Sequence, residues 1–358
     1  MSTQRILAIN PGSTSTKIAV FEGETQVFIK NIKHPAEDIA QFAVITDQYE
    51  FRKGIILSEL KENNIDLNTI KVIVGRGGLV KFIPSGVYTV NEAMENDLKA
   101  GVNGQHASNL GGLIAADIAR SIPGASAYIA DPVVVDELQD VARISGHPLF
   151  ERTSVFHALN QKAIARTYAK EVHKKYEDLN LIVVHLGGGI SIGAHLNGRV
   201  IDVNQALDGD GPFSPERSGS VPVGQLAKLC FSGKHTYDEV KKMITGKGGY
   251  VAYLGSNDAY EIEQKAAAGD EKSILIETAM AYQVSKEVGA MASVLKGKVD
   301  AILLTGGIAH SKTFTAMISE HVGFIAPVKI YPGEDEMRAL ASNGLLVLTK
   351  ELSPSVYK

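Results

Sequence analysis

Apolar residues in this chain gather into short runs that alternate with longer stretches of helical spacing. The short runs lie at residues 6–9, 72–74, 127–130, 182–184 and 301–304, and we expect each to lie in a buried strand. Helical spacing predicts helices over residues 38–61, 107–121, 154–175 and 273–295, and a last helix that starts near residue 334. Strands that alternate with helices in this way indicate an α/β fold.

One strand–turn–strand pattern occurs twice along the chain. Residues 6–20 and 182–194 align without a gap, and each copy is an apolar strand, a tight turn and a second strand. A hairpin at the start of each half predicts mixed rather than purely parallel sheets. The alignment pairs Asn10 with His185, Gly12 with Gly187, Thr16 with Ser191 and Gly23 with Gly198.

The repeated turns have the composition of anion-binding loops. Consecutive backbone N–H groups of a glycine-rich turn can point at one phosphate, and glycine lets the phosphate approach closely. Gly12 and residues 187–189 supply the glycines, and the hydroxyls of Ser13, Thr14 and Ser15 add donors. Neither turn has Walker or dinucleotide spacing. The alternative is an ordinary hairpin whose glycines only satisfy turn geometry.

A third glycine turn follows the strand at residues 301–304. Thr305, Gly306 and Gly307 would let a nucleotide base or ribose lie against bare backbone. A strand-to-helix connection that needs glycine for its conformation is the alternative interpretation.

Polar residues stand where the predicted strands end, which is where ligands bind in open α/β sheets. Asn10 and His185 end the first strands of the two copies, and this matched placement favours a role near a transferred phosphate. Asp131 ends the strand at 127–130 and is a natural Mg²⁺ ligand. A buried structural histidine and a turn-capping aspartate are the alternatives.

Two arginines occupy glycine-rich loops, where no helix face solvates them. Arg76 lies among glycines after the strand at 72–74, and Arg217 lies in the loop 208–222. A guanidinium group binds carboxylate or phosphate in a fork. Surface ion pairs are the alternative for both arginines, and His106 could be a simple residue at a helix entry.

Composition narrows the class of protein. The 358 residues are enough for two domains with cores of their own, and the net charge of −4 argues against nucleic-acid binding. The single cysteine, Cys230, excludes an intramolecular disulfide and is typical of a reducing compartment. No signal-like segment opens the sequence, and no apolar run reaches the roughly 18–20 residues that span a bilayer. We expect a cytoplasmic protein without nucleic-acid or membrane partners.

At these motifs the sequence resembles the acetokinase family. The two signatures at residues 9–17 and 185–191 are similar to those of that family. The likeness extends over nearly the whole chain, through residues 75–78, 104–106, 131–132, 217–219 and 305–309.

The resemblance implies the fold of the acetate and sugar kinase, heat-shock chaperone and actin superfamily. Such proteins have two ribonuclease H-like domains, each a mixed sheet flanked by helices, that close around ATP and Mg²⁺. The first domain is expected over residues 1–154, completed by the C-terminal helix 332–358. The second, over residues 155–331, is expected to carry most of the nucleotide site.

The resemblance also implies roles for single residues. It implies catalytic roles for Arg76, Asp131, His185 and Arg217. It implies that Arg76, His106, Asn160 and Arg217 bind the acid. It implies an ATP site made of Asn10, Gly12, Ser13, Thr14, Ser15, Thr16, Lys17, Gly187, Gly188, Gly189, Gly306, Gly307 and Ile308. It implies a metal site made of Asn10, Asp131 and Glu336, with Glu334 and Asp335 as alternatives to Glu336.

The resemblance implies a kinase that transfers a phosphoryl group directly from ATP to a short-chain carboxylic acid. Asn160 stands where acetate kinases carry a histidine, and Gly188 stands where they usually carry asparagine. These differences favour butyrate, or a branched acid such as isobutyrate, over acetate or propionate. A homodimer or higher homo-oligomer is the family expectation. A chaperone-like or filament protein and a sugar kinase of the same fold remain the competing classes.

Overall fold

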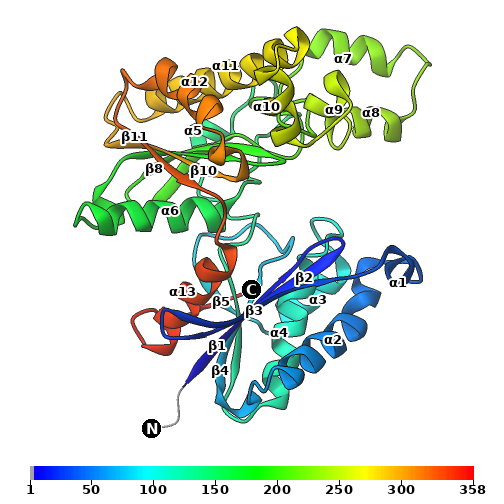
Figure 1. Ribbon diagram of the computed structural model, residues 1–358, viewed down its shortest axis with the longest axis vertical. Helices are drawn as coiled ribbons and strands as arrows, with labels where there is room; N and C mark the ends of the chain where they lie inside the picture. The colour runs from blue at the N-terminus through cyan, green and yellow to red at the C-terminus, as the bar shows by residue number, and fades with distance from the viewer. Residues whose placement is uncertain (1–3) are drawn as a thin grey trace. The chain divides into compact units, whose positions relative to one another are not determined.

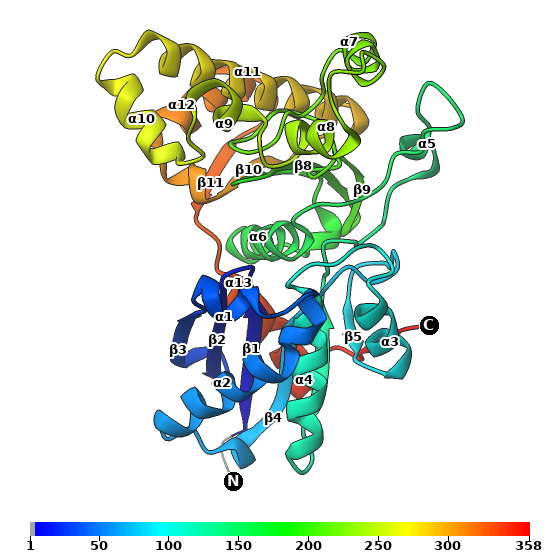
Figure 2. The ribbon, with the colours of Figure 1, turned by 90° about the vertical axis from the view of Figure 1, so that its right-hand side faces the viewer.

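A computed structural model of the chain describes residues 4–358. Contacts divide it into two compact units (Figures 1 and 2). The first unit holds the described residues up to Val135 together with Asp335–Lys358, and the second holds Asp136–Glu334. The predicted boundaries lie at 154/155 and 331/332, whereas the contacts place residues 136–154 and 332–334 in the second unit.

The first unit is built on a seven-stranded mixed sheet in the order β12-β5-β6-β4-β1-β2-β3. Strand β1 pairs antiparallel with β2 and parallel with β4, and β4 pairs parallel with β6. The carboxyl ends of β1, β4 and β6 therefore meet at one edge of the sheet. The strands are β1 Arg5–Pro11, β2 Ser15–Glu22, β3 Thr25–Lys33, β4 Ile70–Arg76, β5 Val87–Thr89, β6 Ser126–Ala130 and β12 Ser355–Val356.

Helices cover both faces of this sheet because its central strands are apolar on both sides. Ile9 and Ile73 share a core with Ile114 of α4, whereas Val72 and Val74 lie against Gly344 of α13. Alternate residues of a strand point to opposite faces, so α4 and α13 lie on opposite sides. The helices are α1 Ala36–Ala40, α2 Tyr49–Glu62, α3 Glu92–Ala100, α4 Asn109–Ser121 and α13 Glu336–Leu348.

The second unit is built on a five-stranded mixed sheet in the order β11-β10-β7-β8-β9. This order repeats the segment β6-β4-β1-β2-β3 of the first sheet, with the same parallel and antiparallel pairings. The predicted duplication is therefore present in the strand topology. The strands are β7 Leu181–Leu186, β8 Ile190–Leu196, β9 Arg199–Val203, β10 Ala301–Gly306 and β11 Val328–Pro332.

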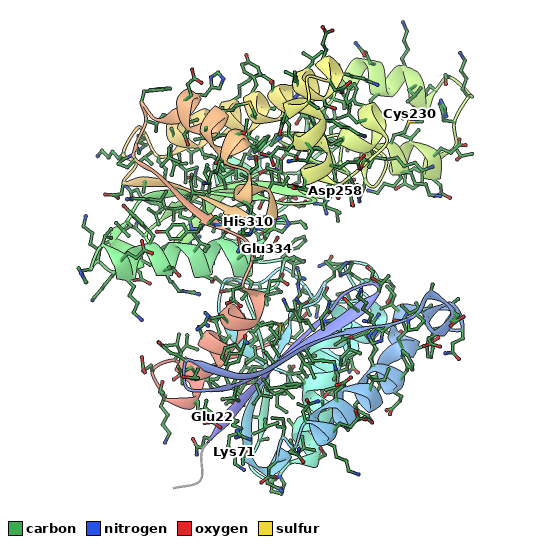
Figure 3. All side chains as sticks on the ribbon, viewed as in Figure 1. Glu22, Lys71, Cys230, Asp258, His310 and Glu334 are labelled. Carbon is green, nitrogen blue, oxygen red and sulfur yellow. The ribbon has the colours of Figure 1, made fainter. Side chains whose placement is uncertain are left out.

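Two cores cover the faces of the second sheet. Ile182 and Val184 of β7 pack with the long helix α11, while Val183 packs with Ala165 of α6 on the opposite face. The helices of this unit are α5 Asp140–Arg143, α6 Ala158–Glu171, α7 Val223–Cys230, α8 Tyr237–Ile244, α9 Gly249–Leu254, α10 Ala259–Ala267, α11 Glu271–Val294 and α12 Lys312–Val322. Cys230, labelled in Figure 3, is exposed at the end of α7. Across residues 4–358, no helix combines the length and the apolar character needed to cross a membrane.

One predicted helix is wrong. The stretch 38–61 contains the break between α1 and α2, where only a short 3₁₀ turn, Ile45–Gln48, is helical. Val44, Ile45 and Thr46 are three consecutive β-branched residues, which disfavour an α-helix. The break allows α2 to start at Tyr49, and this start places Arg52 in the first turn of the helix.

Candidate functional site

The first repeated turn connects β1 to β2 at the carboxyl end of the sheet. The backbone N–H of Gly12 donates to the carbonyl of Ser15 at 2.7 Å and closes the turn. Ser13 and Thr14 at its tip are exposed, and so is Lys17 on β2. The side chains at the tip of this turn are therefore exposed at the carboxyl end of the sheet.

The second turn, between β7 and β8, is one residue tighter than the gapless alignment implies. Leu186 pairs with Ile190 here, whereas Pro11 pairs with Thr16 in the first copy. Gly189 in this turn leaves room for Arg217, because a Cβ on Gly189 would overlap the Arg217 guanidinium. The Ser214 hydroxyl donates to the Gly188 carbonyl at 2.6 Å and fixes the turn from behind.

Three predicted residues of the first unit meet at the ends of β1 and β4 and at the start of α13. The Arg76 guanidinium lies 3.1 Å from Glu336 Oε1, and its Nη1 donates to Asn10 Oδ1 at 3.3 Å. The Asn10 amide donates to the Glu336 carboxylate. Of the three acidic candidates near residue 335, Glu336 is therefore the one that contacts Asn10 and Arg76. Asp335 instead caps α13, and Glu334 belongs to the second unit.

Asp131 follows β6, next to Arg76 in the sheet register, because Arg76 pairs with Ala130. It is buried, and its Oδ1 accepts hydrogen bonds from the Ser85 hydroxyl at 2.6 Å and from the Gly86 amide at 2.9 Å. Its φ of 38° is in the left-handed region, which is uncommon for a residue other than glycine. Two donors thus hold this carboxylate at the sheet edge.

The oxygen donors at this edge fit a magnesium ion that arrives with a nucleotide. Mg²⁺ prefers oxygen ligands and usually takes one or two carboxylates, with phosphate oxygens and water completing its shell. Asn10, Glu336 and Asp131 supply an amide oxygen and two carboxylates. Within residues 4–358 no group of three His, Cys, Asp or Glu side chains is arranged as a complete metal site.

His185 ends β7 in the second unit and is almost fully buried. Its Nδ1 lies 2.8 Å from Asn160 Oδ1, and its Nε2 lies 3.1 Å from Glu334 Oε1. The ring of His157 stacks on it, with centroids 3.7 Å apart and an interplanar angle of 10°. Asn160, which is only 7% exposed, therefore contacts the His185 ring. His157 is not among the predicted site residues, although it stands three residues before Asn160.

A buried hydrogen-bond chain continues from His157 into the core of the second unit. Ser191 Oγ lies 2.9 Å from His157 Nδ1 and accepts from the Gln161 amide at 2.8 Å. Gln161 Oε1 lies 3.0 Å from His195 Nε2, and His195 Nδ1 lies 2.7 Å from the Tyr176 hydroxyl. Complete burial holds the pKa of His195 well below its usual range, so this ring is neutral.

One set of proton positions gives every member of this chain a partner. The neutral His195 accepts from Tyr176 at Nδ1 and donates from Nε2 to Gln161. The Gln161 amide then donates to Ser191, and the Ser191 hydroxyl donates to His157 Nδ1. In this arrangement a neutral His157 carries its proton on Nε2.

Arg217 lies beside the second turn, where it is largely buried. Its Nη1 donates to the Ala206 carbonyl, and its guanidinium packs on the bare backbone of Gly189. Burial lowers the pKa of the guanidinium from its usual value. Its Nε is buried and has no hydrogen-bond partner in the described part of the chain. The guanidinium group of Arg217 thus lies next to the glycine turn, with its Nε–H available as a donor in the described part of the chain.

The third glycine turn ends β10 in the same unit. Gly306 has a φ of 94°, and a Cβ there would overlap the Leu186 backbone. Only glycine allows β10 to approach β7 this closely, and the 3₁₀ helix Gly307–His310, which contains Ile308, follows directly. His310 and Glu334 are labelled in Figure 3.

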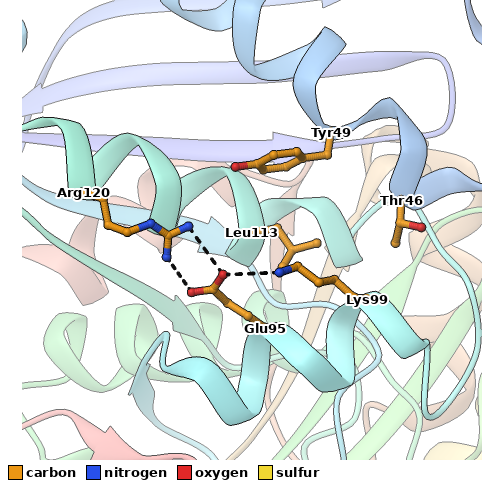
Figure 4. A pocket seen from close by; sticks show the side chains of 6 residues that line it. All are labelled: Thr46, Tyr49, Glu95, Lys99, Leu113 and Arg120. Carbon is orange, nitrogen blue, oxygen red and sulfur yellow. Dashed lines mark hydrogen bonds and ion pairs between the residues drawn. The ribbon is translucent and has the colours of Figure 1, made fainter.

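Two other features of the first unit stand apart from these groups. His106 is exposed before α4, and its Nδ1 lies 2.8 Å from the Ser108 hydroxyl. A separate pocket is lined by Thr46, Tyr49, Glu95, Lys99, Leu113 and Arg120 (Figure 4). Arg120 and Lys99 both pair with Glu95, at 2.7 and 3.8 Å, and Arg120 also pairs with Asp117 at 3.4 Å, so both cations of this pocket have acidic partners and we assign it no ligand.

Comparisons with known proteins agree on the kind of protein to which this chain is similar. The model of the Acetokinase family matches residues 149–340. Butyrate kinase 2 and Butyrate kinase 1 of Clostridium acetobutylicum are 56% and 58% identical to this chain over 354 residues, which are 99% of this chain and of each relative.

Solved structures share the fold at much lower identity. The acetate kinase of Porphyromonas gingivalis superposes with a TM-score of 0.77 at 20% identity, covering 96% of this chain and 100% of its own. A propionate kinase from Francisella tularensis gives a TM-score of 0.76 at 19% identity, covering 95% of this chain and 98% of its own. These likenesses confirm the predicted fold class.

Proposed function

The chain belongs to the acetokinase family, and from this membership we propose that it catalyses the reaction ATP + butanoate = ADP + butanoyl phosphate. The observation that carries this proposal is the identity of 56% and 58%, over 99% of the chain, to two proteins named butyrate kinase. The protein is then a phosphotransferase with a carboxyl group as acceptor.

The acceptor needs no general base. A carboxylic acid of pKa between about 4 and 5 is already ionised at neutral pH, so its oxygen can attack phosphorus directly. The obstacle is repulsion between the carboxylate and the triphosphate, and phosphoryl transfer is governed mainly by positioning and electrostatics. We propose direct in-line transfer without a phosphoenzyme, in which Asp131 organises the metal and is not a base.

Residues of the first unit supply one part of this chemistry. The Arg76 fork, which contacts Asn10 and Glu336, would bind the acid carboxylate and the transferred phosphoryl group. Asn10, Glu336 and Asp131 would hold Mg²⁺, which neutralises charge on the phosphates when it is bound. The amides and hydroxyls of the first turn would hold phosphate oxygens. His106, exposed before α4, would be a further contact to the acid.

Residues of the second unit supply the other part. His185, with the ring of His157 stacked on it, would steady the transferred phosphoryl group, and the guanidinium of Arg217 would add positive charge beside Gly189. Backbone donors of residues 187–189 would hold the phosphate chain, while Gly306, Gly307 and Ile308 would border the nucleoside. Asn160 would orient His185 rather than contact the acid directly, because its Oδ1 lies at the His185 ring.

Hydroxamate trapping of the acyl phosphate tests the proposal. The protein is incubated with ATP, Mg²⁺ and acetate, propionate, butyrate, isobutyrate or valerate, and the hydroxamate formed is measured with each acid. We expect the highest kcat/KM with butyrate. Higher values with isobutyrate or acetate would correct the acceptor, and no hydroxamate with any acid would reject the kinase activity. Inversion at a chiral phosphorus is expected, and net retention would contradict direct transfer.

A further inference from the structure

A buried arginine lies directly behind the first turn. Arg52, on α2, is only 1% exposed. Its Nη1 donates to the carbonyl oxygens of Gly12 and Ser15 at 2.7 and 3.1 Å, and its Nη2 donates to the carbonyl of Ser13 at 3.1 Å. One side chain thus binds three carbonyls within a turn of four residues.

Within residues 4–358, the charge of Arg52 has no acidic partner. Its acceptors in residues 4–358 are these carbonyls, the side-chain oxygen of Gln48 and the hydroxyl of Thr16, and none is a carboxylate. Burial lowers its pKa to about 10, which leaves it charged at neutral pH. Its neighbour Lys53 differs, since it pairs with Glu50 and Asp117, each at 2.7 Å. Burying a cation without an anionic partner destabilises the folded protein. The positive charge of Arg52 would therefore attract an anion bound on the exposed side of the turn.

The contacts also set the direction of the turn amides. In a planar trans peptide the C=O and N–H groups point in opposite directions. Because the carbonyls of Gly12 and Ser13 point at Arg52, the N–H groups of Ser13 and Thr14 point away from it, toward the exposed side of the turn. Adjacent N–H groups that point the same way form an anion-binding concavity.

Two further side chains contact the guanidinium group of Arg52, and a third side chain contacts one of these two. Gln48 Oε1 accepts from Nε at 3.0 Å and from Nη2 at 2.7 Å. Thr16 Oγ1 accepts from Nη1 at 3.1 Å and lies 2.8 Å from His34 Nε2. His34 is neutral, because burial lowers its pKa to about 4, so its Nε2 can accept the Thr16 proton. The orientation of Arg52 is thereby over-determined.

The second turn has a different support. There a neutral hydroxyl, that of Ser214, binds the Gly188 carbonyl, and Arg217 lies beside the glycines rather than beneath the carbonyls. The arginine anchor is therefore specific to the first turn.

We propose that Arg52 is a positioning residue for the nucleotide phosphates: it fixes the first turn with its N–H groups outward and places a buried positive charge behind them. This inference rests on the proposed function for the identity of the ligand as ATP. Arg52 does not touch the substrate in this role, and it acts through the turn. The first turn should therefore prefer a polyphosphate to a monophosphate, because the longer chain carries more negative charge and is attracted more strongly by the positive charge of Arg52.

Nucleotide binding by Arg52→Met tests the proposal. Calorimetry with ATP and with AMP is compared for the wild type, Arg52→Met, Arg52→Lys and the control Lys61→Met, which removes an exposed charge from the same helix. We expect Arg52→Met to weaken ATP binding by about tenfold or more, as for other supporting residues, and AMP binding much less. Arg52→Lys keeps the charge without the fork and should recover part of the loss. Lys61→Met should resemble the wild type.

Equal weakening of ATP and AMP, or no weakening of either, by a folded Arg52→Met would overturn the proposal. If that variant does not fold, Gln48→Met decides, because it keeps Arg52 but removes the acceptor that orients it; selective loss of ATP affinity supports the proposal and unchanged ATP affinity rejects it. These measurements need no acid substrate. Their outcome is therefore distinguishable from failure of the wild type to phosphorylate butyrate, which would reject the proposed function alone.

Discussion

Hydrogen bonds through Gln161 and Ser191 connect neutral His195 to His157 in the second unit. Neutral His195 can donate only from the nitrogen that faces Gln161, and this direction passes through Ser191 to His157. Gln161, Ser191 and His195 are buried, so water does not compete for their hydrogen bonds, and each bond fixes the next. Its effect at the site is one N–H on His157 Nε2, in a ring stacked on His185.

Ser191→Ala should therefore impair turnover more than binding. The variant removes the donor to His157 Nδ1, and the ring can then adopt the other tautomer, which offers no N–H at Nε2. We expect kcat to fall by about tenfold, while the affinity for ATP changes little. Nitrogen NMR of the histidine ring reports the tautomer directly. Ser232→Ala, at an exposed serine, is the control; an unchanged tautomer and kcat in Ser191→Ala would remove the chain from the mechanism.

The neutral state of His34 predicts a pH dependence of stability. Its pKa is lowered from 6.5 to about 4 by burial and by the charge of Arg52, against a smaller opposing effect of Asp38. In the unfolded chain His34 therefore binds a proton below about pH 6.5, whereas in the folded protein it binds a proton only below about pH 4. The folded protein consequently loses stability as the pH falls from about 6.5 to about 4.

His34→Gln should remove this part of the acid sensitivity. Glutamine can still accept from Thr16 but does not titrate. Urea unfolding of both proteins at about pH 7 and about pH 5 should give a smaller loss of unfolding free energy for the variant. Equal losses in the two proteins would show that His34 is not the neutral acceptor.

The sequence could predict some of these residues and not others. Asn10 and His185 were identifiable because the repeat places both at the end of a strand. His157 and Arg52 were not, because each lies on a segment without a glycine turn. The stacking of His157 on His185 and the contacts of Arg52 with the first turn join segments that only the fold brings together. An arginine within a predicted helix is ordinarily solvated, and the burial of Arg52 has no local sequence signal.

At the level of elements, strands were easier to predict than helices. The five apolar runs all lie in strands, β1, β4, β6, β7 and β10, because a strand buried on both faces is a continuous apolar run. Helices α7 to α10 were not predicted. They are short, and most of their residues are exposed, so they lack the long apolar stripe that identifies a helix in a sequence.

The packing of α4 on β4 depends on two glycines that face each other, Gly75 and Gly111. A Cβ on Gly111 would overlap the Arg76 carbonyl and approach its nitrogen at 3.0 Å. Gly111→Ala must therefore push α4 off the strand that carries Arg76. Inserting a group into a packed contact costs about 1–3 kcal/mol, and the displaced Arg76 backbone should lower activity as well.

Urea unfolding and kcat/KM measure both effects. Gly54→Ala is the matched control, because a Cβ on Gly54 meets nothing within 4 Å in helix α2. That variant should be stabilised by about 0.5–1 kcal/mol, the gain of alanine over glycine in a helix, with unchanged activity. Wild-type stability in Gly111→Ala would show that the close approach of α4 to β4 tolerates a side chain.

At the scale of the whole molecule, the duplication places different chemistry on equivalent positions. Both sheets carry the same hairpin at the same place, yet the first copy ends β1 with Asn10 and the second ends β7 with His185. The first turn rests on the charge of Arg52 and the second on the hydroxyl of Ser214. The sequence indicated the repeat, but it could not show the tighter second turn, because that difference is one of strand register and not of chain length.

The proposed function assigns Arg76 of the first unit and Arg217 of the second unit to the same step, the transfer of the phosphoryl group. Arg76→Ala alone should lower kcat/KM by about a hundredfold or more while leaving ATP affinity largely intact, since it removes charge stabilisation at the transferred group. Residues that act as a unit give non-additive losses, so Arg76→Ala combined with Arg217→Ala should lose little beyond the more damaged single variant. Adding Lys61→Met to Arg76→Ala, as a control, should leave the single-variant value unchanged. Hydroxamate formation from butyrate measures all of these variants. Losses that multiply in the double arginine variant would mean that Arg76 and Arg217 act independently, on separate steps.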